Sequence, residues 1–249
     1  MTIASSYKCS DSKSTSVSTI KTLNCNGCLQ HKNCLSGELN DDELLEFNSI
    51  AKHSKKLQRG EFLYKSGDKF DAIYIIRSGS LKNTLIDEEG REQILNFSIQ
   101  GDVIGLEGLY KQKHITESKA LETTFLCSIS LAQYLNLASQ TPKLYRRLLN
   151  HMSSRIIEEE EHSLMLGTKN TEQKLATFIL RLIKRNSQHE FSDSEITLNI
   201  SRKDIGNYLS AAVETISRIF TRFQDQGLIE VQGRHIRVVD MERLENIAK

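Results

Sequence analysis

Four of the five cysteines have the type and spacing that could support chemistry. Three form a C-x2-C-x5-C run at Cys25, Cys28 and Cys34, and the fourth, Cys127, lies far downstream in an apolar stretch typical of a strand. Thiolates at this spacing can reach one soft metal centre, and both a [4Fe–4S] cluster and a tetrahedral zinc ion take four cysteine ligands. The sequence therefore predicts a four-cysteine site that is compatible with either group.

A thiol oxidoreductase using Cys25 and Cys28 is an alternative from a different class of protein. Redox C-x-x-C pairs lie near a βαβ pattern, whereas the flanks of this pair are typical of loops. The sequence contains no Ser/His/Asp set, glycine-rich phosphate loop or paired-carboxylate site, and its seven histidines are scattered. We therefore expect no enzymatic activity.

Composition narrows the class of protein. The length of 249 residues suits two modest domains, and a net charge of +1 still allows the local basic face that DNA binding needs. No run of about 18 apolar residues occurs, and residues 1–24 lack the apolar region of a secretory signal. Five cysteines, an odd number, argue against a disulfide framework and for a reducing cytoplasm, with Cys9 a free thiol.

Changes in sequence pattern divide the chain into four parts. Residues 1–36 hold the cysteine run, residues 139–167 form a long helix, and residues 168–249 form a helical domain that ends in a hairpin. In residues 37–138 short apolar stretches alternate with glycines, which is typical of an all-β barrel or jelly roll. Asn40 is the expected N-cap of a helix over residues 39–51, and Thr171 that of a later helix. The pattern predicts an α+β fold.

The long helix carries an a/d seam. Its members recur at alternating spacings of four and three residues: Tyr145, Leu149, Met152, Ile156, Glu159, Ser163 and Leu166. This seam predicts pairing with a second copy of the chain, and packing on its own domain alone is the alternative. Glu159 belongs to the acidic run 158–161, which also fits a solvated face. Two facing Glu159 carboxylates without partners would oppose dimerisation.

Residues 201–238 have the pattern of a winged helix-turn-helix. Ser201 caps a short helix with Asp204 at its third position, and a second helix over residues 212–226 ends at Gly227. A hairpin around Gly233 follows. The second helix has an apolar face of Val213, Ile216, Phe220 and Phe223.

The opposite face of that second helix has side chains that suit DNA. Glu214, Ser217 and Arg218 are types that read base edges in the major groove. Arg202 and Arg222 are expected to contact phosphates. A solvated amphipathic helix is the alternative, but the turn and the trailing hairpin favour DNA reading.

The chain resembles the CRP/FNR family of bacterial transcription regulators, and particularly its fumarate and nitrate reduction regulator (FNR) branch. Three features carry the resemblance: Asp204-Ile205-Gly206-Asn207-Tyr208-Leu209 followed by Val213-Glu214-Thr215-Ile216-Ser217-Arg218, Ala120-Leu121-Glu122-Thr123 before Cys127, and the cysteine pattern. The resemblance implies a double-stranded β-helix of the cyclic-nucleotide-binding type as a sensor domain. A dimerisation helix and a C-terminal winged helix-turn-helix would follow it.

The resemblance also implies a function. Cys25, Cys28, Cys34 and Cys127 match the ligands of an oxygen-labile [4Fe–4S] cluster, and Glu214, Ser217 and Arg218 match base-reading residues. A cytoplasmic homodimer would respond to oxygen, bind palindromic promoter DNA under anaerobic conditions and act as an activator with RNA polymerase. A zinc-stabilised regulator and a cyclic-nucleotide-responsive regulator remain open alternatives.

Two positions depart from the nucleotide-binding members of the family. Those members carry a Gly-Glu pair and a later Arg-Ser or Arg-Thr pair that hold the ribose and the cyclic phosphate. Here Leu106 follows Gly105, and Glu117 precedes Ser118. A carboxylate facing a phosphate is repulsive, so we expect no cyclic nucleotide to bind.

Overall fold

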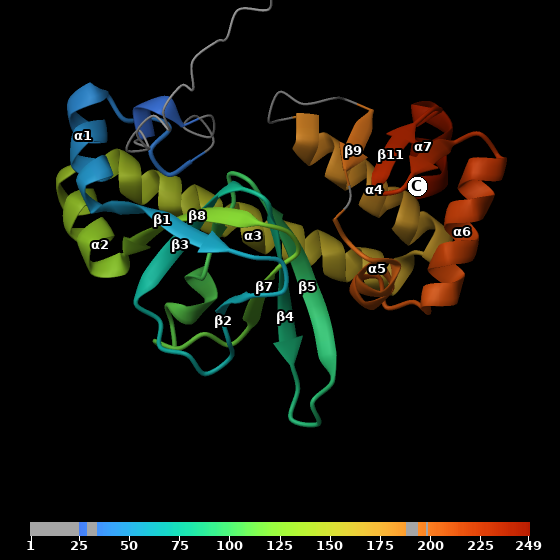
Figure 1. Cartoon of the computed structure of the whole chain (residues 1–249), viewed down its shortest axis with the longest axis horizontal. Helices are drawn as coiled ribbons and strands as arrows, with labels where there is room; N and C mark the ends of the chain where they lie inside the picture. Colours follow the sequence, from blue (N-terminus) through green and yellow to red (C-terminus); the bar gives the residue numbers. More distant parts are fainter. Residues whose placement is uncertain (1–24, 29–33, 188–193, 198) are drawn as a thin grey trace, which may run out of the picture.

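The computed structural model describes residues 25–28, 34–187, 194–197 and 199–249 (Figure 1). Its first part contains η1 (Cys25–Gly27), α1 (Asp41–Ile50), β1 (Ala51–Leu57), β2 (Phe62–Tyr64), β3 (Ala72–Ser78), β4 (Ser80–Ile86), β5 (Glu92–Ile99), β6 (Val103–Ile104), η3 (Leu106–Gly108), β7 (Glu117–Ala120), β8 (Thr124–Ser130) and α2 (Leu131–Gln140). Its second part contains α3 (Pro142–Thr168), α4 (Thr171–Ser187), β9 (Glu195–Thr197), α5 (Arg202–Tyr208), α6 (Val213–Asp225), β10 (Ile229–Gln232), β11 (His235–Val238) and α7 (Met241–Ala248). The predicted α+β fold is confirmed.

The sensor domain is a roll of two antiparallel four-stranded sheets. Their strand orders are β1-β8-β3-β6 and β2-β7-β4-β5, which matches the predicted double-stranded β-helix. β8 lies between β1 and β3, and its Cys127 pairs with Ile75. The turn between β4 and β5 contains Gly90 at φ +79°, a left-handed conformation that glycine adopts without steric cost. The turn at residues 87–90 therefore joins two long paired strands.

Helix starts follow local capping chemistry. Asn40 accepts a hydrogen bond from the Glu43 backbone N–H at 2.9 Å, while the Glu43 carboxylate accepts one from the Asn40 backbone N–H at 2.8 Å. This reciprocal pair confirms the predicted cap of α1. At α4 the prediction was wrong by one residue, because Asn170 rather than Thr171 forms the equivalent pair with Gln173.

Helix α3 connects the sensor domain to the C-terminal domain (Figure 1). One side of the helix packs within the chain through Leu144, Leu148, His162 and Met165. Pro142 occupies the first turn, where its missing N–H breaks no helical hydrogen bond. The N-terminal half of α3 therefore packs with the sensor core, and the C-terminal half with the C-terminal domain.

The C-terminal domain contains the predicted winged helix-turn-helix. Helix α6 buries Ile216, Ile219, Phe220 and Phe223, whereas Val213 is 36% exposed, so its predicted place in the core is wrong. Val213 lies in the first turn of α6, beyond the reach of the domain core. The wing has a third strand that sequence reasoning missed, because β9 is only three residues long and pairs with β11.

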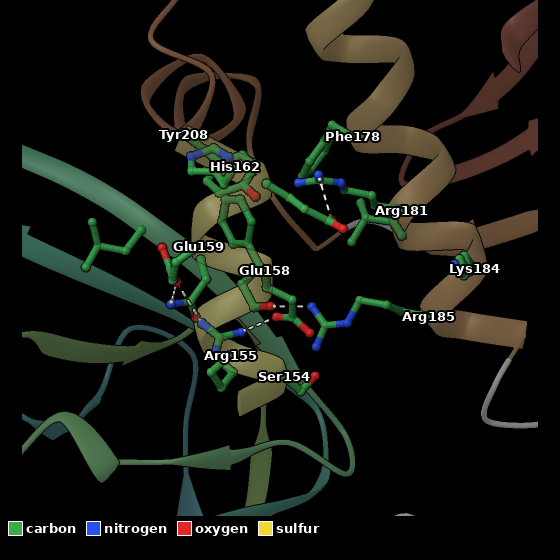
Figure 2. A pocket seen from close by; sticks show the side chains of 15 residues that line it. Ser154, Arg155, Glu158, Glu159, His162, Phe178, Arg181, Lys184, Arg185 and Tyr208 are labelled. Atoms are coloured by element: carbon green, nitrogen blue, oxygen red, sulfur yellow. Dashed lines mark hydrogen bonds and ion pairs between the residues drawn. The ribbon is translucent and has the colours of Figure 1, made fainter. Parts of the chain in front are cut away.

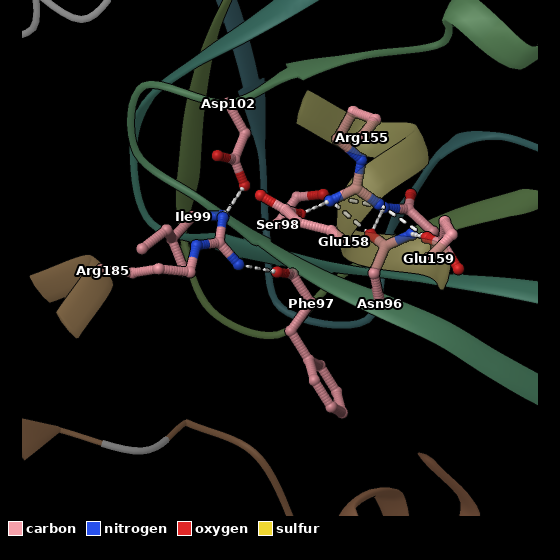
Figure 3. A network of polar contacts seen from close by, with 10 residues as sticks. Asn96, Phe97, Ser98, Ile99, Asp102, Arg155, Glu158, Glu159 and Arg185 are labelled. Carbon is pink, nitrogen blue, oxygen red and sulfur yellow. Dashed lines mark hydrogen bonds and ion pairs between the residues drawn. The ribbon is translucent and has the colours of Figure 1, made fainter. Parts of the chain in front are cut away.

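Helix α5 docks on the sensor domain. Lys82 on β4 lies 2.6 Å from the Asp204 carboxylate, and Asn207 accepts from the Ile94 backbone N–H at 2.6 Å and donates to the Glu92 carbonyl at 2.7 Å. Arg185 on α4 adds a 2.5 Å ion pair to Asp102 and a 3.0 Å bond to the Phe97 carbonyl (Figure 3). The sensor and the DNA-reading domains are thus held together by polar contacts.

No helix in the described part of the chain has the length and apolar character needed to span a membrane.

Candidate functional site

Three of the four predicted ligand cysteines lie in one buried cluster. Cys25, Cys34 and Cys127 are 6%, 8% and 8% exposed, and they share a core with residues of the sheets and of α1 and α2. Cys28 is partly exposed. Residues 29–33, between the second and third cysteines, lie outside the described residues, as does Cys9. The fold thus brings the amino-terminal cysteine segment against β8.

The thiols influence one another electrostatically. The pKa of Cys25 and that of Cys127 are raised to about 12, chiefly by burial and in part by charge on the neighbouring cysteines, while Arg77 opposes the shift. Burial also raises the pKa of Cys34. At neutral pH these thiols are protonated, so ionisation needs a compensating positive charge, which a bound metal centre supplies.

The donor set suits a sulfur-ligated centre, but it is not compact. Three buried thiols and a fourth, partly exposed one are the kind of donor that a four-cysteine cluster or metal takes. Within the described ranges, no three or more His, Cys, Asp or Glu side chains are grouped closely enough to hold a metal ion. Binding would therefore have to draw the sulfurs together.

Helix α3 is tied directly to the cysteine segment by a residue that sequence reasoning missed. The Arg147 guanidinium donates to the Cys34 carbonyl at 2.7 Å. Two more contacts join the same helix turn to this region: Arg146 lies 2.9 Å from Glu38, and Lys143 lies 2.9 Å from Glu43. In the sequence, an arginine that directly follows another arginine gives no signal for this role. The start of α3 is therefore positioned by the backbone of a candidate ligand.

The predicted dimer seam lies partly on the surface. Leu149 and Ile156 are 63% and 58% exposed and Tyr145 is 40% exposed, whereas Met152 and Leu166 are partly buried and Ser163 is exposed. Ile157 and Leu164, at 52% and 66% exposure, extend the apolar surface beyond the predicted seam. This exposed apolar surface on a long helix is what a second copy of the chain would cover.

Glu159 has partners within its own chain. Its carboxylate lies 3.0 Å from Arg155 and accepts from Asn96 at 3.4 Å (Figure 3). Burial raises the pKa of Glu159, against the favourable charge of Arg155. Glu159 is therefore partnered within its own chain, because Arg155 lies one turn before it and β5 supplies an amide.

A pocket of about 280 Å³ lies between α3, α4 and β5 (Figure 2). His162 of α3 is stacked on Tyr208 of α5, with ring centroids 4.1 Å apart. Burial lowers the pKa of His162 to about 4, helped by the positive charges of Arg181 and Lys174. A neutral His162 therefore joins the long helix to the helix-turn-helix.

A second hollow of about 510 Å³ lies between the roll and α3. Its charged lining includes Glu107, Glu159 and Glu160 with Arg155. The Glu107 carboxylate accepts from Thr116 at 3.1 Å and lies 2.9 Å from His114 Nδ1. An excess of carboxylates disfavours a cyclic phosphate here; the absence of nucleotide binding stays a prediction.

The predicted base-reading residues lie together on the exposed face of α6. Glu214, Ser217 and Arg218 are all exposed. Ser217 donates to the Val213 carbonyl at 2.8 Å, and Arg218 reaches Thr215 at 3.4 Å. Arg218 forms no ion pair with a described residue, so its guanidinium is available to a base edge.

The two predicted phosphate contacts differ in availability. Arg222 lies 2.6 Å from the Glu172 carboxylate of α4, so a phosphate would have to compete with that carboxylate. The Arg202 guanidinium lies 3.1 Å from the centroid of the Phe220 ring, and it forms no ion pair with a described residue. Arg202 is thus the better candidate of the two.

Comparisons with known proteins agree with this architecture. Residues 54–141 match a cyclic nucleotide-binding domain and residues 173–247 match a Crp-like helix-turn-helix domain. The chain is 40% identical over 222 residues to the anaerobic regulatory protein of Haemophilus influenzae, covering 89% of this chain and 86% of that protein. It is 36% identical over 226 residues to the fumarate and nitrate reduction regulatory protein of Escherichia coli, covering 91% and 90%.

The fold is also similar to a solved structure of the same class. The structure of FixK2 from Bradyrhizobium japonicum aligns with a TM-score of 0.74 at 26% identity, over 80% of this chain and 98% of that one. These relatives are DNA-binding transcription regulators and not enzymes. The chain therefore belongs to the CRP/FNR family of transcription regulators, and within it to the FNR branch.

Proposed function

We propose that the chain is an oxygen-responsive transcription regulator whose Cys25, Cys28, Cys34 and Cys127 hold a [4Fe–4S] cluster. The observation that carries this proposal is the joint burial of three of these thiols, from two distant parts of the chain, in one core cluster. Four-cysteine ligation is typical of such clusters. The relatives named as anaerobic and as fumarate and nitrate reduction regulators support an oxygen signal.

The bound cluster would supply an oxygen-labile cross-link between the cysteine segment and the roll. Cys34 then has a fixed position, and its carbonyl holds Arg147 at the start of α3. The Glu38 and Glu43 contacts steady the same turns of the helix. Loss of the cross-link would release this end of α3 and weaken dimerisation through the surface that includes Leu149.

DNA binding as a homodimer gives this control its output. A two-fold dimer would present two α6 helices to half-sites about 10 base pairs apart, so the promoter site should be palindromic. Glu214, Ser217 and Arg218 would read bases there, and the DNA-bound dimer would act on RNA polymerase. In this proposal oxygen acts on dimerisation, and dimerisation acts on DNA affinity.

Anaerobic purification tests the proposal. We expect a coloured protein with about four iron and four sulfide per chain, as one cubane cluster requires. Exposure to air should remove the visible absorption and reduce both dimer content and DNA affinity. A colourless protein with one zinc per chain would overturn the cluster and support the structural zinc alternative.

A further inference from the structure

Most arginines in the described part of the chain lie within 4 Å of a carboxylate. Arg59, Arg202, Arg218 and Arg234 form no ion pair with any described residue. Arg218 lies on the reading face of α6. The other three line a single hollow of about 270 Å³. These four arginines thus lie at two places, one of which reads DNA in the proposed function.

The hollow joins parts that are distant in the sequence. Arg59 comes from the turn between β1 and β2 of the sensor domain, Arg202 begins α5, and Arg234 belongs to the wing turn. The rest of its lining is Asn199, Ile200, Ser201, Gly233 and Ile236. No carboxylate is among the lining residues, so the three guanidinium groups make the hollow positively charged, and an anion would offset that charge.

Local contacts hold two of the three guanidinium groups in position. The Arg202 guanidinium packs on the Phe220 ring of α6, and Arg234 donates to Asn199 at 3.0 Å. Burial lowers the pKa of Arg202 to about 10, so it remains charged at neutral pH. Arg59 is exposed and free to reach a ligand.

The position of the hollow identifies the anion. In helix-turn-helix proteins the second helix enters the major groove while the first helix crosses the DNA backbone. Here the hollow lies between the first helix and the wing, and it touches α6 through Arg202. Guanidinium groups match phosphate oxygens with two parallel hydrogen bonds.

We propose that Arg59, Arg202 and Arg234 together bind a backbone phosphate of the DNA, so that the sensor domain itself contacts DNA. This inference rests on the DNA-binding part of the proposed function and is independent of the oxygen signal. One phosphate would then bridge the sensor turn and the wing, in addition to the contacts of Lys82 and Arg185. DNA would favour the docked arrangement of the two domains.

The salt dependence of DNA binding tests this site. The full-length protein is purified anaerobically and titrated against two duplexes of about 40 base pairs, roughly four helical turns. One duplex carries the sequence that the protein enriches from a random pool, and the other has a random sequence. Fluorescence anisotropy at several KCl concentrations gives the slope of log affinity against log salt. Arg59→Ala should make that slope shallower by about one per chain and weaken binding to both duplexes by the same factor.

Matched variants make the result specific. Arg59→Lys keeps the charge and should retain most of the slope, and Arg234→Ala should repeat the change seen for Arg59→Ala. Arg91→Ala, another exposed arginine of the sensor domain but paired with Asp87 and Glu89, should match the parent. A parent-like slope for both Arg59→Ala and Arg234→Ala would overturn the phosphate site.

Three further outcomes decide between the phosphate site, its alternative and the oxygen proposal. The first replaces KCl by potassium phosphate at equal ionic strength. If the hollow binds free phosphate, phosphate will weaken DNA binding by the parent but not by Arg59→Ala. That result, together with an unchanged salt slope in Arg59→Ala, would overturn the assignment to DNA. If the parent binds DNA equally in air and without oxygen, the oxygen proposal fails while the slope comparison still decides the phosphate site. Failure of the parent to bind either duplex would overturn both.

Discussion

The cysteine cluster and the reading face of α6 are built in opposite ways. The reading face uses Glu214, Ser217 and Arg218 from one continuous helix, and all three are exposed. The cysteine cluster joins Cys127 of β8 to residues far earlier in the chain, and it lies in the core. One site is complete as soon as its helix forms, whereas the other exists only when the tertiary structure does.

The electrostatic environments of the two sites also differ. Burial raises the pKa of the Cys25 and Cys127 thiols to about 12, whereas Arg218 lies exposed to solvent. A buried donor set is costly to ionise without a ligand, so its occupancy can govern the fold around it. In the proposed function, this difference assigns regulation to the buried site and recognition to the exposed one. Helix α3 joins them.

The strongest test of this division removes one buried ligand. Cys127→Ser should reduce iron and sulfide from about four per chain to near zero, because three thiolates leave one corner of the cluster without a ligand. Anaerobic metal and sulfide assays measure this, with Cys9→Ser as the control that retains the parent content. A full cluster in Cys127→Ser would show that the two parts of the chain are not joined as proposed.

Charge placed on the exposed seam should break the link between the two sites. Ile156→Glu puts two unpartnered carboxylates into the dimer interface, which costs about 3–5 kcal/mol, or more than a hundredfold in dimer affinity. Anaerobic analytical ultracentrifugation should find it monomeric with its cluster intact. Leu45→Glu, an equally exposed leucine on α1, is the control and should remain dimeric; an anaerobic dimer of Ile156→Glu would refute the seam.

Arg147 tests how the buried site reaches α3. Arg147→Ala removes the charged hydrogen bond to the Cys34 carbonyl, and such bonds contribute about 1.5–3 kcal/mol. We expect a parent-like iron content but dimer affinity lowered about tenfold or more. Arg146→Ala, which loses only an exposed ion pair to Glu38, should change little. Equal dimerisation of both variants would mean that this contact carries no signal.

Substitutions on the reading face of α6 should change DNA recognition without changing the cysteine cluster. Arg218→Ala should lose a bidentate base contact, costing about 1–3 kcal/mol and relaxing the preference at one base pair of each half-site. Arg222→Ala, which breaks the pair with Glu172, should leave the sequence preference intact. Competition binding with single-base variants of the selected duplex measures both. Unchanged selectivity in Arg218→Ala would contradict its role.

His162 offers the smallest effect and tests the connection through α3. Its pKa of about 4 lies below the ordinary value of 6.5, so the folded state favours the neutral ring. The free energy of unfolding therefore has its full value above about pH 6.5. It decreases as the pH falls towards 4, by about 1–2 kcal/mol at pH 5, because the unfolded state binds the proton first. Urea unfolding at several pH values should show this in the parent. His162→Phe keeps an aromatic ring against Tyr208 and should lack this part of the pH dependence.

Much of the fold was predictable because its signals are local. The capping pair of Asn40 and Glu43, the glycine turn before β5 and the spacing along α3 each depend on residues within a few positions of one another. The reading face of α6 follows from the same helical periodicity. The error at Thr171 arose because Asn170 offers an equally good cap one residue earlier.

The remaining features depend on contacts between distant segments, and no local pattern encodes them. Arg147 and Arg146 are neighbours of one type, yet only Arg147 reaches the Cys34 carbonyl. Glu159 pairs locally with Arg155, but it gains its second partner only because β5 places Asn96 beside it.

By itself, the sequence determined the ligand types, the helix periods and the order of the domains, since covalent spacing sets these. The tertiary structure decided which thiols are buried together and which arginines keep no carboxylate partner, since packing alone sets the distances between remote side chains.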